Sequence, residues 1–184
     1  DIARGLLEQG IKLDNNLLQA KNLLGNTYSI TEEYDKAINI LEDTLKQAEA
    51  LNDKFNIAWS LILLGWVYQW TGQNEEKVLP YIERGLKISR EIGDEEAIAN
   101  SLGELGAYYH RKYDFERGMR YTKECYEIVV KLGLKKNISL TLMGMAEIYL
   151  IQGEYKKSLE TMSKSFEIGK EMGNVYWEGI CHQV

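Results

Sequence analysis

A short segment recurs along this chain at an almost constant interval. Each of its four copies places a small residue three positions before a tyrosine, and the small residues are Gly25, Gly65, Gly106 and Ala146. The intervals between them are 40, 41 and 40 residues. A period of this length predicts a stacked array of supersecondary units, because one unit alone cannot bury its apolar face. Such arrays bind along a long inner surface, so the sequence favours a binding groove over a catalytic pocket.

Each repeat is predicted to contain two antiparallel helices. In the second repeat the first helix spans residues 53–70, and its apolar stripe at spacings of three and four is Leu61, Leu64, Gly65 and Tyr68. In the turn that follows, Gly72 is expected to end the helix in the left-handed conformation and Asn74 to cap the next helix. That second helix spans residues 75–92, with the apolar set Val78, Ile82, Leu86 and Ile92.

The ends of the repeats are also periodic. Three glycines lie 40 residues apart at these ends, and an asparagine takes the equivalent place in the first repeat: Asn52, Gly93, Gly133 and Gly173. Asparagine is the next-best residue after glycine for a left-handed helix end, so all four positions predict the same geometry. Asp53, Asp94 and Asn174 come directly afterwards and are expected to cap the helices that follow.

These features together resemble the tetratricopeptide repeat in a longer variant of about 40 residues, with its Leu-Gly-x-x-Tyr signature in the first helix of each repeat. The resemblance covers essentially the whole chain and implies an all-α, right-handed solenoid of antiparallel helix pairs. We predict one array over residues 1–184. Its parts are a partial repeat at 1–13, full repeats at 14–52, 53–93, 94–133 and 134–173, and a partial repeat at 174–184.

Two residues depart from the repeat pattern. Pro80 lies inside a predicted helix, where it cannot donate to the carbonyl of Glu76, and we expect a local bulge there. Lys21 stands where the later repeats have leucine, so the outer packing of the first repeat is harder to predict.

The resemblance implies that the first helix of each repeat lines the concave wall. Transferred position by position, the residues predicted to face the groove include Gln19, Asn22 and Asn26 in the first repeat; Trp59, Ile62, Trp66, Gln69 and Trp70 in the second; Asn100, Gly103, Ala107, His110 and Arg111 in the third; and Met143, Glu147 and Leu150 in the fourth. Three tryptophans of this set share one helix face at steps of seven and four residues. Burying one tryptophan removes about 150–250 Å² from water, about 4–6 kcal/mol gross, so three uncovered rings favour a ligand groove.

Other interpretations of these residues stay open. The tryptophans could pack on the next repeat or form a crystal or homodimer contact. Asparagine and glutamine side chains on the wall could hold the backbone of an extended peptide or be merely solvated. His110 and Arg111 could anchor a carboxylate or simply end an exposed helix. Trp177 is assigned to packing or capping.

Composition excludes several classes of function. The chain has 22 basic and 28 acidic side chains, a net charge of −6, which disfavours nucleic acid as a partner. The two cysteines, Cys125 and Cys181, favour a reducing compartment, and Cys125 is expected to be a small packing residue. The absence of a transmembrane run or signal peptide points to a cytoplasmic protein without a membrane partner. The chain begins and ends within helical patterns, so we expect a piece of a longer protein.

No motif for catalysis, a metal or a cofactor is present, so we predict a protein that is not an enzyme. The predicted function is a protein- or peptide-binding module whose aromatic-lined concave groove captures an apolar peptide or an amphipathic helix. The alternative is a domain that senses a small molecule or signal peptide within a larger regulator. Self-association through the groove or through the ends of the array would make the protein a homodimeric scaffold.

Overall fold

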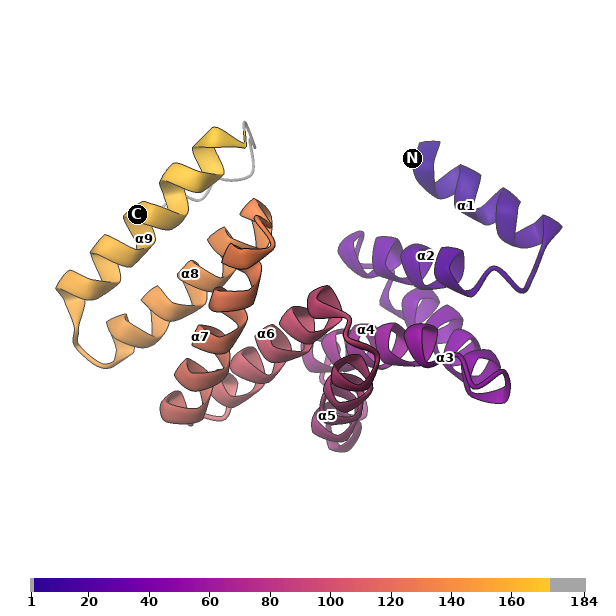
Figure 1. Cartoon of the computed structure of the whole chain (residues 1–184), viewed down its shortest axis with the longest axis horizontal. Coiled ribbons are helices and arrows are strands. Elements are labelled where there is room, and N and C mark those ends of the chain that lie inside the picture. The colour runs from indigo at the N-terminus through magenta and orange to yellow at the C-terminus, as the bar shows by residue number, and fades with distance from the viewer. Residues whose placement is uncertain (1, 173–184) are drawn as a thin grey trace. The chain divides into compact units, whose positions relative to one another are not determined.

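The computed structural model describes residues 2–172, which form helices and no strand (Figure 1). The helices are α1 (Ile2–Leu13), α2 (Leu18–Ile30), α3 (Tyr34–Ala50), α4 (Lys54–Thr71), α5 (Glu75–Ile92), α6 (Glu95–Arg111), α7 (Phe115–Lys131), α8 (Lys135–Ile151) and α9 (Tyr155–Glu171). The fold class is therefore an all-α solenoid of helix pairs, as predicted. Gly173, Asn174 and Trp177, together with the predicted partial repeat at 174–184, lie outside the described residues.

The chain divides into two compact units. The first unit comprises residues 1–104 and the second comprises residues 105–184, so α6 begins in one and ends in the other. The predicted boundaries of the single repeats are a finer division, and they stay a prediction.

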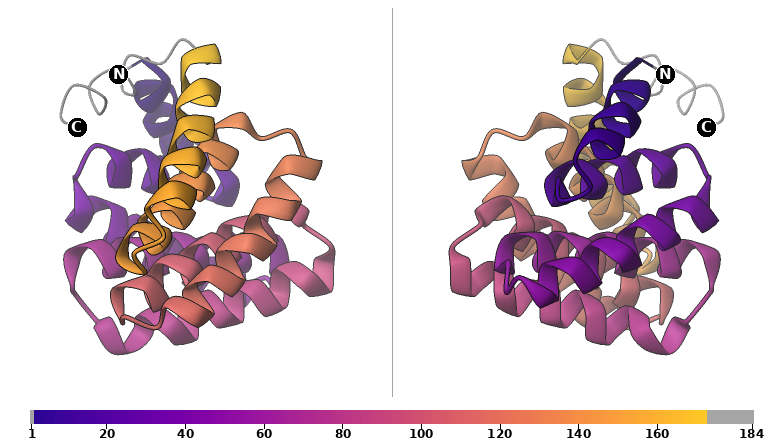
Figure 2. Two further views of the ribbon diagram at one scale, coloured as in Figure 1. Left: turned by 90° about the vertical axis from the view of Figure 1, so that its left-hand side faces the viewer. Right: turned by 90° about the vertical axis from the view of Figure 1, so that its right-hand side faces the viewer.

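In the first unit, each helix packs on the next one along the chain from α1 to α5, and α2 also contacts α4 directly (Figures 1 and 2). The first helices of two successive repeats therefore lie side by side. The fully buried side chains of α3, α4 and α5 form much of the core, which includes Leu41, Leu61, Leu64, Tyr68 and Ile82. Gly65 is required at the α4–α5 contact, because a Cβ atom there would lie 2.5 Å from Ile82 Cγ1.

The helix ends follow local sequence closely. Asn52, Gly72 and Gly93 all have positive φ, between 52° and 71°, so the predicted left-handed ends are confirmed. Asp53 caps α4 by accepting a hydrogen bond from the backbone N–H of Asn56. Asn74 differs from the prediction: its φ is 47°, and its side chain makes no capping hydrogen bond to α5, because that backbone conformation does not aim the amide at the first turn.

Two further predictions about the first unit were wrong. The helix α5 continues through Pro80 without the expected bulge, since Pro80 is exposed and water can solvate the freed carbonyl of Glu76. Ile92 was assigned to the apolar stripe, but it is exposed at the end of α5, where the helix has passed the edge of the core.

Lys21 is the main irregularity of the core. Its side chain is only 2% exposed, and its ammonium lies 2.9 Å from Asp43 Oδ2 and 3.1 Å from Gln47 Oε1 on α3. The methylene stem is buried and the charge is paired at the edge of the helix pair. This is how a lysine replaces the leucine of the other repeats.

In the second unit, α8 packs on both α7 and α9, and α8 and α9 lie side by side in both figures. The end of α6 approaches α7 closely: a Cβ atom at Gly106 would lie 2.5 Å from Thr122 Oγ1. The helices α8 and α9 are joined by two buried serines, Ser139 and Ser165, each of which donates to the backbone carbonyl of the other. Cys125 is buried against Thr141, as expected for a packing residue.

Candidate functional site

The helix α4 is apolar on two opposite sides. Leu61, Leu64 and Tyr68 form the buried side, while the other side carries a stripe at steps of four, four, three and four residues: Phe55, Trp59, Leu63, Trp66 and Trp70. We call this stripe the aromatic face. Its members are half-buried or exposed, and Trp70 is 59% exposed. The core does not cover the aromatic face, which is the arrangement expected of a binding surface.

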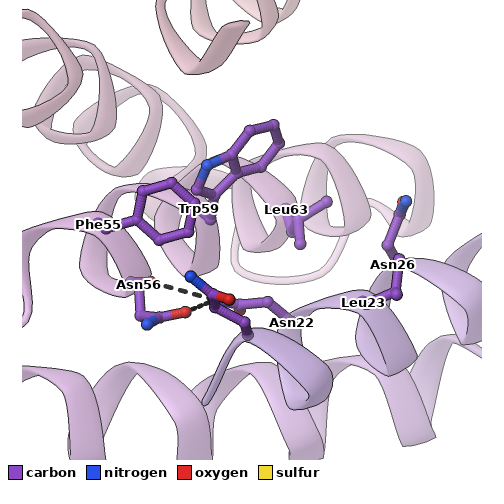
Figure 3. Close-up of a pocket in the computed structure, with 8 residues that line it drawn as sticks. Asn22, Leu23, Asn26, Phe55, Asn56, Trp59 and Leu63 are labelled. Carbon is purple, nitrogen blue, oxygen red and sulfur yellow. Dashed lines mark hydrogen bonds between the residues drawn. The ribbon is translucent and has the colours of Figure 1, made fainter. Parts of the chain in front are cut away.

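A pocket of about 260 Å³ opens between the aromatic face and α2 (Figure 3). Its lining is contributed entirely by α2 and α4: Gln19, Asn22, Leu23, Asn26, Phe55, Asn56, Trp59 and Leu63. Figure 3 shows the rings of Phe55 and Trp59 and the side chain of Leu63 opposite Asn22 and Asn26. None of these eight side chains carries a charge. The pocket therefore suits an apolar group approached by a few polar atoms.

The indole of Trp59 is held in place by contacts on two sides. Its ring centroid lies 6.4 Å from that of Phe55 in a tilted arrangement, and its Nε1 donates to Asp94 Oδ2 at 3.1 Å. Further along α4, the rings of Trp66 and Trp70 form a second tilted pair with centroids 6.1 Å apart. These contacts preorganise the aromatic face, so less freedom is lost when a guest binds.

The floor of the pocket is a buried amide network. Asn22 is 6% exposed; its Nδ2 donates to the carbonyl and to Oδ1 of Asn56, and its Oδ1 accepts from Ser60. Asn56 in turn donates to Asp53. The amide of Asn22 is thus committed to the first unit itself, in contrast to its predicted role in holding a peptide, because α2 and α4 approach each other at this point.

The rim of the pocket carries two amides of a different kind. Gln19 is exposed and Asn26 is half-buried, and neither side chain makes a hydrogen bond to any of residues 2–172. They lie seven residues apart on α2, two helical turns, on the side that faces Trp59 and Leu63. Both offer a donor and an acceptor to an incoming group.

The remaining predicted residues of the first unit take different positions. Ile62 is 3% exposed and packs towards α5, where a Cβ atom on Gly85 would lie 3.0 Å from its Cγ1, so it does not face the groove. Gln69 donates to Glu104 at 3.1 Å, and Asn100 donates to the carbonyl of Glu96 on its own helix. Gly103 is half-buried on α6.

In the second unit, the predicted residues lie on α6 and α8. His110 is half-buried, with its ring 5.7 Å from that of Phe115 and its Nδ1 3.9 Å from Glu147 Oε2. The residues Ala107, Arg111, Met143 and Leu150 are half-buried or exposed. The structure thus brings His110 and Glu147 together, and it places a carboxylate of this chain where a guest carboxylate was considered.

Sequence reasoning missed four residues of the pocket: Leu23, Phe55, Asn56 and Leu63. The signal for two of them was present, because Phe55 and Leu63 lie four residues before and after Trp59 and so share its helix face. Leu23 and Asn56 could not be found in this way. They reach the pocket because of how α2 and α4 pack, which the helix pattern does not specify.

The described part of the chain, residues 2–172, contains no group of three or more histidine, cysteine, aspartate or glutamate side chains placed to hold a metal ion. It also contains no helix that combines the length and the apolar character needed to span a membrane.

Comparison with known proteins agrees with the fold. Residues 16–91 match the tetratricopeptide repeat family. Tetratricopeptide repeat protein 29 of Trypanosoma brucei brucei is 27% identical over 173 residues, which are 89% of this chain and 36% of that protein. The chain thus spans about a third of the length of the curated relative that it matches.

Solved structures give the same result for the backbone. The crystal structure of BtubC from P. vanneervenii superimposes with a TM-score of 0.70 at 19% identity, covering 86% of this chain and 65% of that one. A signal-transduction ATPase with a tetratricopeptide repeat sensor from Pyrococcus horikoshii gives 0.71 at 24% identity, covering 95% and 28%. The periodic helix pairs, the small residues where paired helices approach and the family match over residues 16–91 all support a tetratricopeptide repeat array in this chain.

Proposed function

We propose that the first unit binds an apolar peptide segment or an amphipathic helix of another protein in the groove between α2 and α4. Tetratricopeptide repeats generally mediate protein–protein interaction, and the family is typically non-catalytic. On this proposal the chain is a binding module without enzymatic activity.

The observation that carries the proposal is the uncharged pocket beside the uncovered aromatic face. Leu23 is 54% exposed on one wall, while Phe55, Trp59 and Leu63 form the other. Large apolar side chains gathered around a depression are costly to leave in water, and aromatic residues in pockets carry much of the binding energy at interfaces. An apolar anchor of the guest would enter here, with Trp66 and Trp70 extending the contact along α4.

The polar contacts of the guest would come from Gln19 and Asn26. An amide side chain can donate to a peptide carbonyl and accept from a peptide N–H, so these two residues can set the register of a bound main chain. Asn22 acts indirectly, by fixing the spacing between α2 and α4 through its buried hydrogen bonds. Gln69, Asn100 and Gly103 are proposed as peripheral contacts.

The second unit presents its own, smaller set of candidate contacts. Met143 and Leu150 offer apolar surface on α8, and Ala107 leaves room at the end of α6. Arg111, with the neighbouring His110 and Glu147, would add a charge preference. We treat these residues as a separate patch.

The test is a single change inside the pocket with a matched change outside it. Labelled 16-residue peptides selected on the wild-type protein from a random library serve as probes, and affinity is measured by fluorescence anisotropy. Leu63→Asp places a charge in the pocket and should weaken binding by at least about tenfold, because the carboxylate must be desolvated beside an apolar guest. Leu159→Asp on α9, an exposed apolar residue of the second unit, should leave affinity unchanged.

Circular dichroism must show the same helix content for both variants, so that a loss of binding is not a loss of fold. If Leu63→Asp binds the selected peptides as tightly as wild type, the pocket is not the binding site and the proposal is wrong.

A second candidate is the sensing of a small molecule. It is favoured by the partly exposed indole of Trp59 beside unpaired amides, an arrangement that suits stacking on a sugar or base, and a sensor of the same fold occurs in the Pyrococcus horikoshii ATPase. Thermal-shift screening against sugars and nucleotides separates the two candidates. A ligand that raises the melting temperature of wild type but not of Leu63→Asp would favour sensing.

The setting of the domain is also a proposal. We place it in the cytoplasm, without a membrane partner. The net charge of −6 disfavours nucleic acid as a partner. Self-association through the groove is the competing use of the aromatic face. Sedimentation at increasing concentration tests it, because a groove-mediated dimer would be weakened by Leu63→Asp.

A further inference from the structure

Two carboxylates accept hydrogen bonds from residues that line the pocket between α2 and α4. Asp94 Oδ2 accepts from the indole of Trp59 at 3.1 Å, and Asp53 Oδ2 accepts from the amide of Asn56 at 2.7 Å. Trp59 and Asn56 both line the pocket. A second depression, of about 460 Å³, includes Asp53 and shares Gln19 and Asn56 with the pocket, so Asp53 lies on a surface that adjoins the pocket.

The charge on these two carboxylates is not balanced by a basic side chain. Asp94 also accepts from the backbone N–H of Ala97 and Asp53 from that of Asn56, so all of their hydrogen-bond donors within residues 2–172 are neutral. The two aspartates precede α6 and α4, and each helix dipole offsets about half of a charge at most. A substantial negative potential therefore remains at this end of the pocket.

The basic residues of α2 and α4 form ion pairs with other carboxylates. Lys21 is buried against α3 and paired with Asp43. Lys54 forms an ion pair with Glu91 on α5, with Nζ 2.9 Å from Oε2. No cation from α2 or α4 is thus available to neutralise Asp53 or Asp94.

The first unit as a whole also carries an excess of negative charge. Residues 1–104 carry 18 acidic and 10 basic side chains, a formal charge of −8, whereas residues 105–184 carry 10 acidic and 12 basic ones, a formal charge of +2. The negative charge of the chain is thus concentrated in the unit that holds the pocket. Such a field attracts cationic partners and repels anionic ones before contact is made.

We propose that the segment bound between α2 and α4 is basic: an apolar anchor enters the pocket, and lysine or arginine residues beside it in the guest lie next to Asp53 and Asp94. This inference rests on the proposed function, because it specifies the chemistry of the same guest. The anchor supplies most of the affinity through burial. The cationic flanks supply the association rate and the discrimination against acidic segments.

The test uses three labelled 16-residue peptides that share one apolar core, chosen from the peptides selected on wild type, and differ only in their flanks, which are lysine, serine or glutamate. At about 20 mM NaCl the lysine peptide should bind roughly tenfold more tightly than the glutamate peptide, with serine between them. At about 500 mM NaCl the three affinities should converge to within about twofold, because exposed charges are then screened.

Two variants assign the preference to these aspartates. Asp53→Asn and Asp94→Asn remove the charge but keep an N-cap side chain of equal quality, so the fold should survive. Together they should weaken the lysine peptide by about three- to fivefold more than the serine peptide at low salt, because an asparagine Oδ1 can still accept from the indole of Trp59 but carries no charge. Asp114→Asn, at the N-cap of α7 in the second unit, is the matched control and should change neither.

The outcomes separate the inference from the proposed function. Equal binding of all three peptides, with Leu63→Asp still abolishing it, would overturn the basic-guest inference while the groove stands. A lysine preference that persists unchanged in the Asp53→Asn/Asp94→Asn double variant would overturn the assignment to these residues. Binding of all three peptides that Leu63→Asp does not affect would remove the proposed function itself.

Discussion

Gly65 is the small residue of the second repeat, and the structure predicts how much its replacement by alanine should change the stability of the protein. A Cβ atom at this position would lie 2.5 Å from Ile82 Cγ1 and 3.3 Å from Ile82 Cδ1, and Ile82 is completely buried. A branched side chain in a packed core has no free volume to move into, so Gly65→Ala must displace α5 or force Ile82 out of its rotamer. Overpacking of this kind costs about 1–3 kcal/mol.

The same change also stabilises the helix, because alanine in a helix interior is more favourable than glycine by about 1 kcal/mol. The expected net effect of Gly65→Ala is therefore a destabilisation of up to about 2 kcal/mol. Gly144→Ala on α8 is the matched control, since the nearest atom to its added Cβ would be Thr122 Cγ2 at 3.9 Å, an ordinary contact. Only the propensity term applies there, and the protein should gain about 0.5–1 kcal/mol.

The assay is thermal unfolding followed by circular dichroism. For a chain of this length, 1 kcal/mol shifts the melting temperature by roughly 2–4 °C, so Gly65→Ala should melt several degrees below Gly144→Ala. Because repeat arrays unfold with limited cooperativity, hydrogen exchange should locate the loss in α4 and α5. If Gly65→Ala proves as stable as Gly144→Ala, Ile82 yields at little cost, and the argument that close approach requires glycine there is refuted.

Three further predictions concern charge, backbone and buried hydrogen bonds. Lys21→Leu should be neutral or stabilising by about 1 kcal/mol, since an apolar residue of similar size replaces a buried charge. The Lys21 hydrogen bond lowers the pKa of Asp43 below its usual 3.8, so this contribution to stability is present above about pH 4 and is lost as the pH falls through the lowered pKa. Urea titrations should therefore show that Lys21→Leu loses less unfolding free energy than wild type when the pH is lowered below 4. The difference should be under about 1 kcal/mol, because Asp43 is half exposed. Gly93→Ala should destabilise by about 1 kcal/mol in urea denaturation, since φ at this helix end is 71°, whereas no change would show that the left-handed end relaxes freely. Ser165→Ala should cost about 1–2 kcal/mol and speed hydrogen exchange in α8 and α9, because the carbonyl of Ser139 and its hydroxyl lose a buried partner; unchanged exchange there would contradict this.

The aromatic face shows where sequence reasoning about the site succeeded and where it stopped. The spacing of Trp59, Trp66 and Trp70 placed them on one side of α4, away from Leu61 and Leu64, because helix periodicity depends only on the chain itself. The family pattern also placed Ile62 on that side. The structure buries Ile62 against α5. Ile62 lies between the two faces of α4, so the packing of α5 decides whether its side chain is buried or exposed.

Asn22 is a second case of the same kind. From the sequence it is an amide on the inner helix, equivalent to Asn26 one turn later. In the structure Asn22 is buried and bonded to Asn56 and Ser60, more than thirty residues away, while Asn26 faces the open pocket. The difference arises from the point at which α2 and α4 come closest, which no local pattern contains.

The period, the helix pairs and most of their ends could be predicted from the amino-acid sequence alone. These depend on interactions within a few residues: a glycine or asparagine that accepts positive φ, an aspartate that caps the turn after it, and apolar residues spaced by three or four. The tertiary structure alone decided that Asp94 would hold the indole of Trp59, that Lys21 would find Asp43, and that a pocket would open beside Leu23 and Leu63. Each of these needs two segments 20 or more residues apart to meet at one place, and that meeting is set by how whole helices pack rather than by the residues next to each one in the chain.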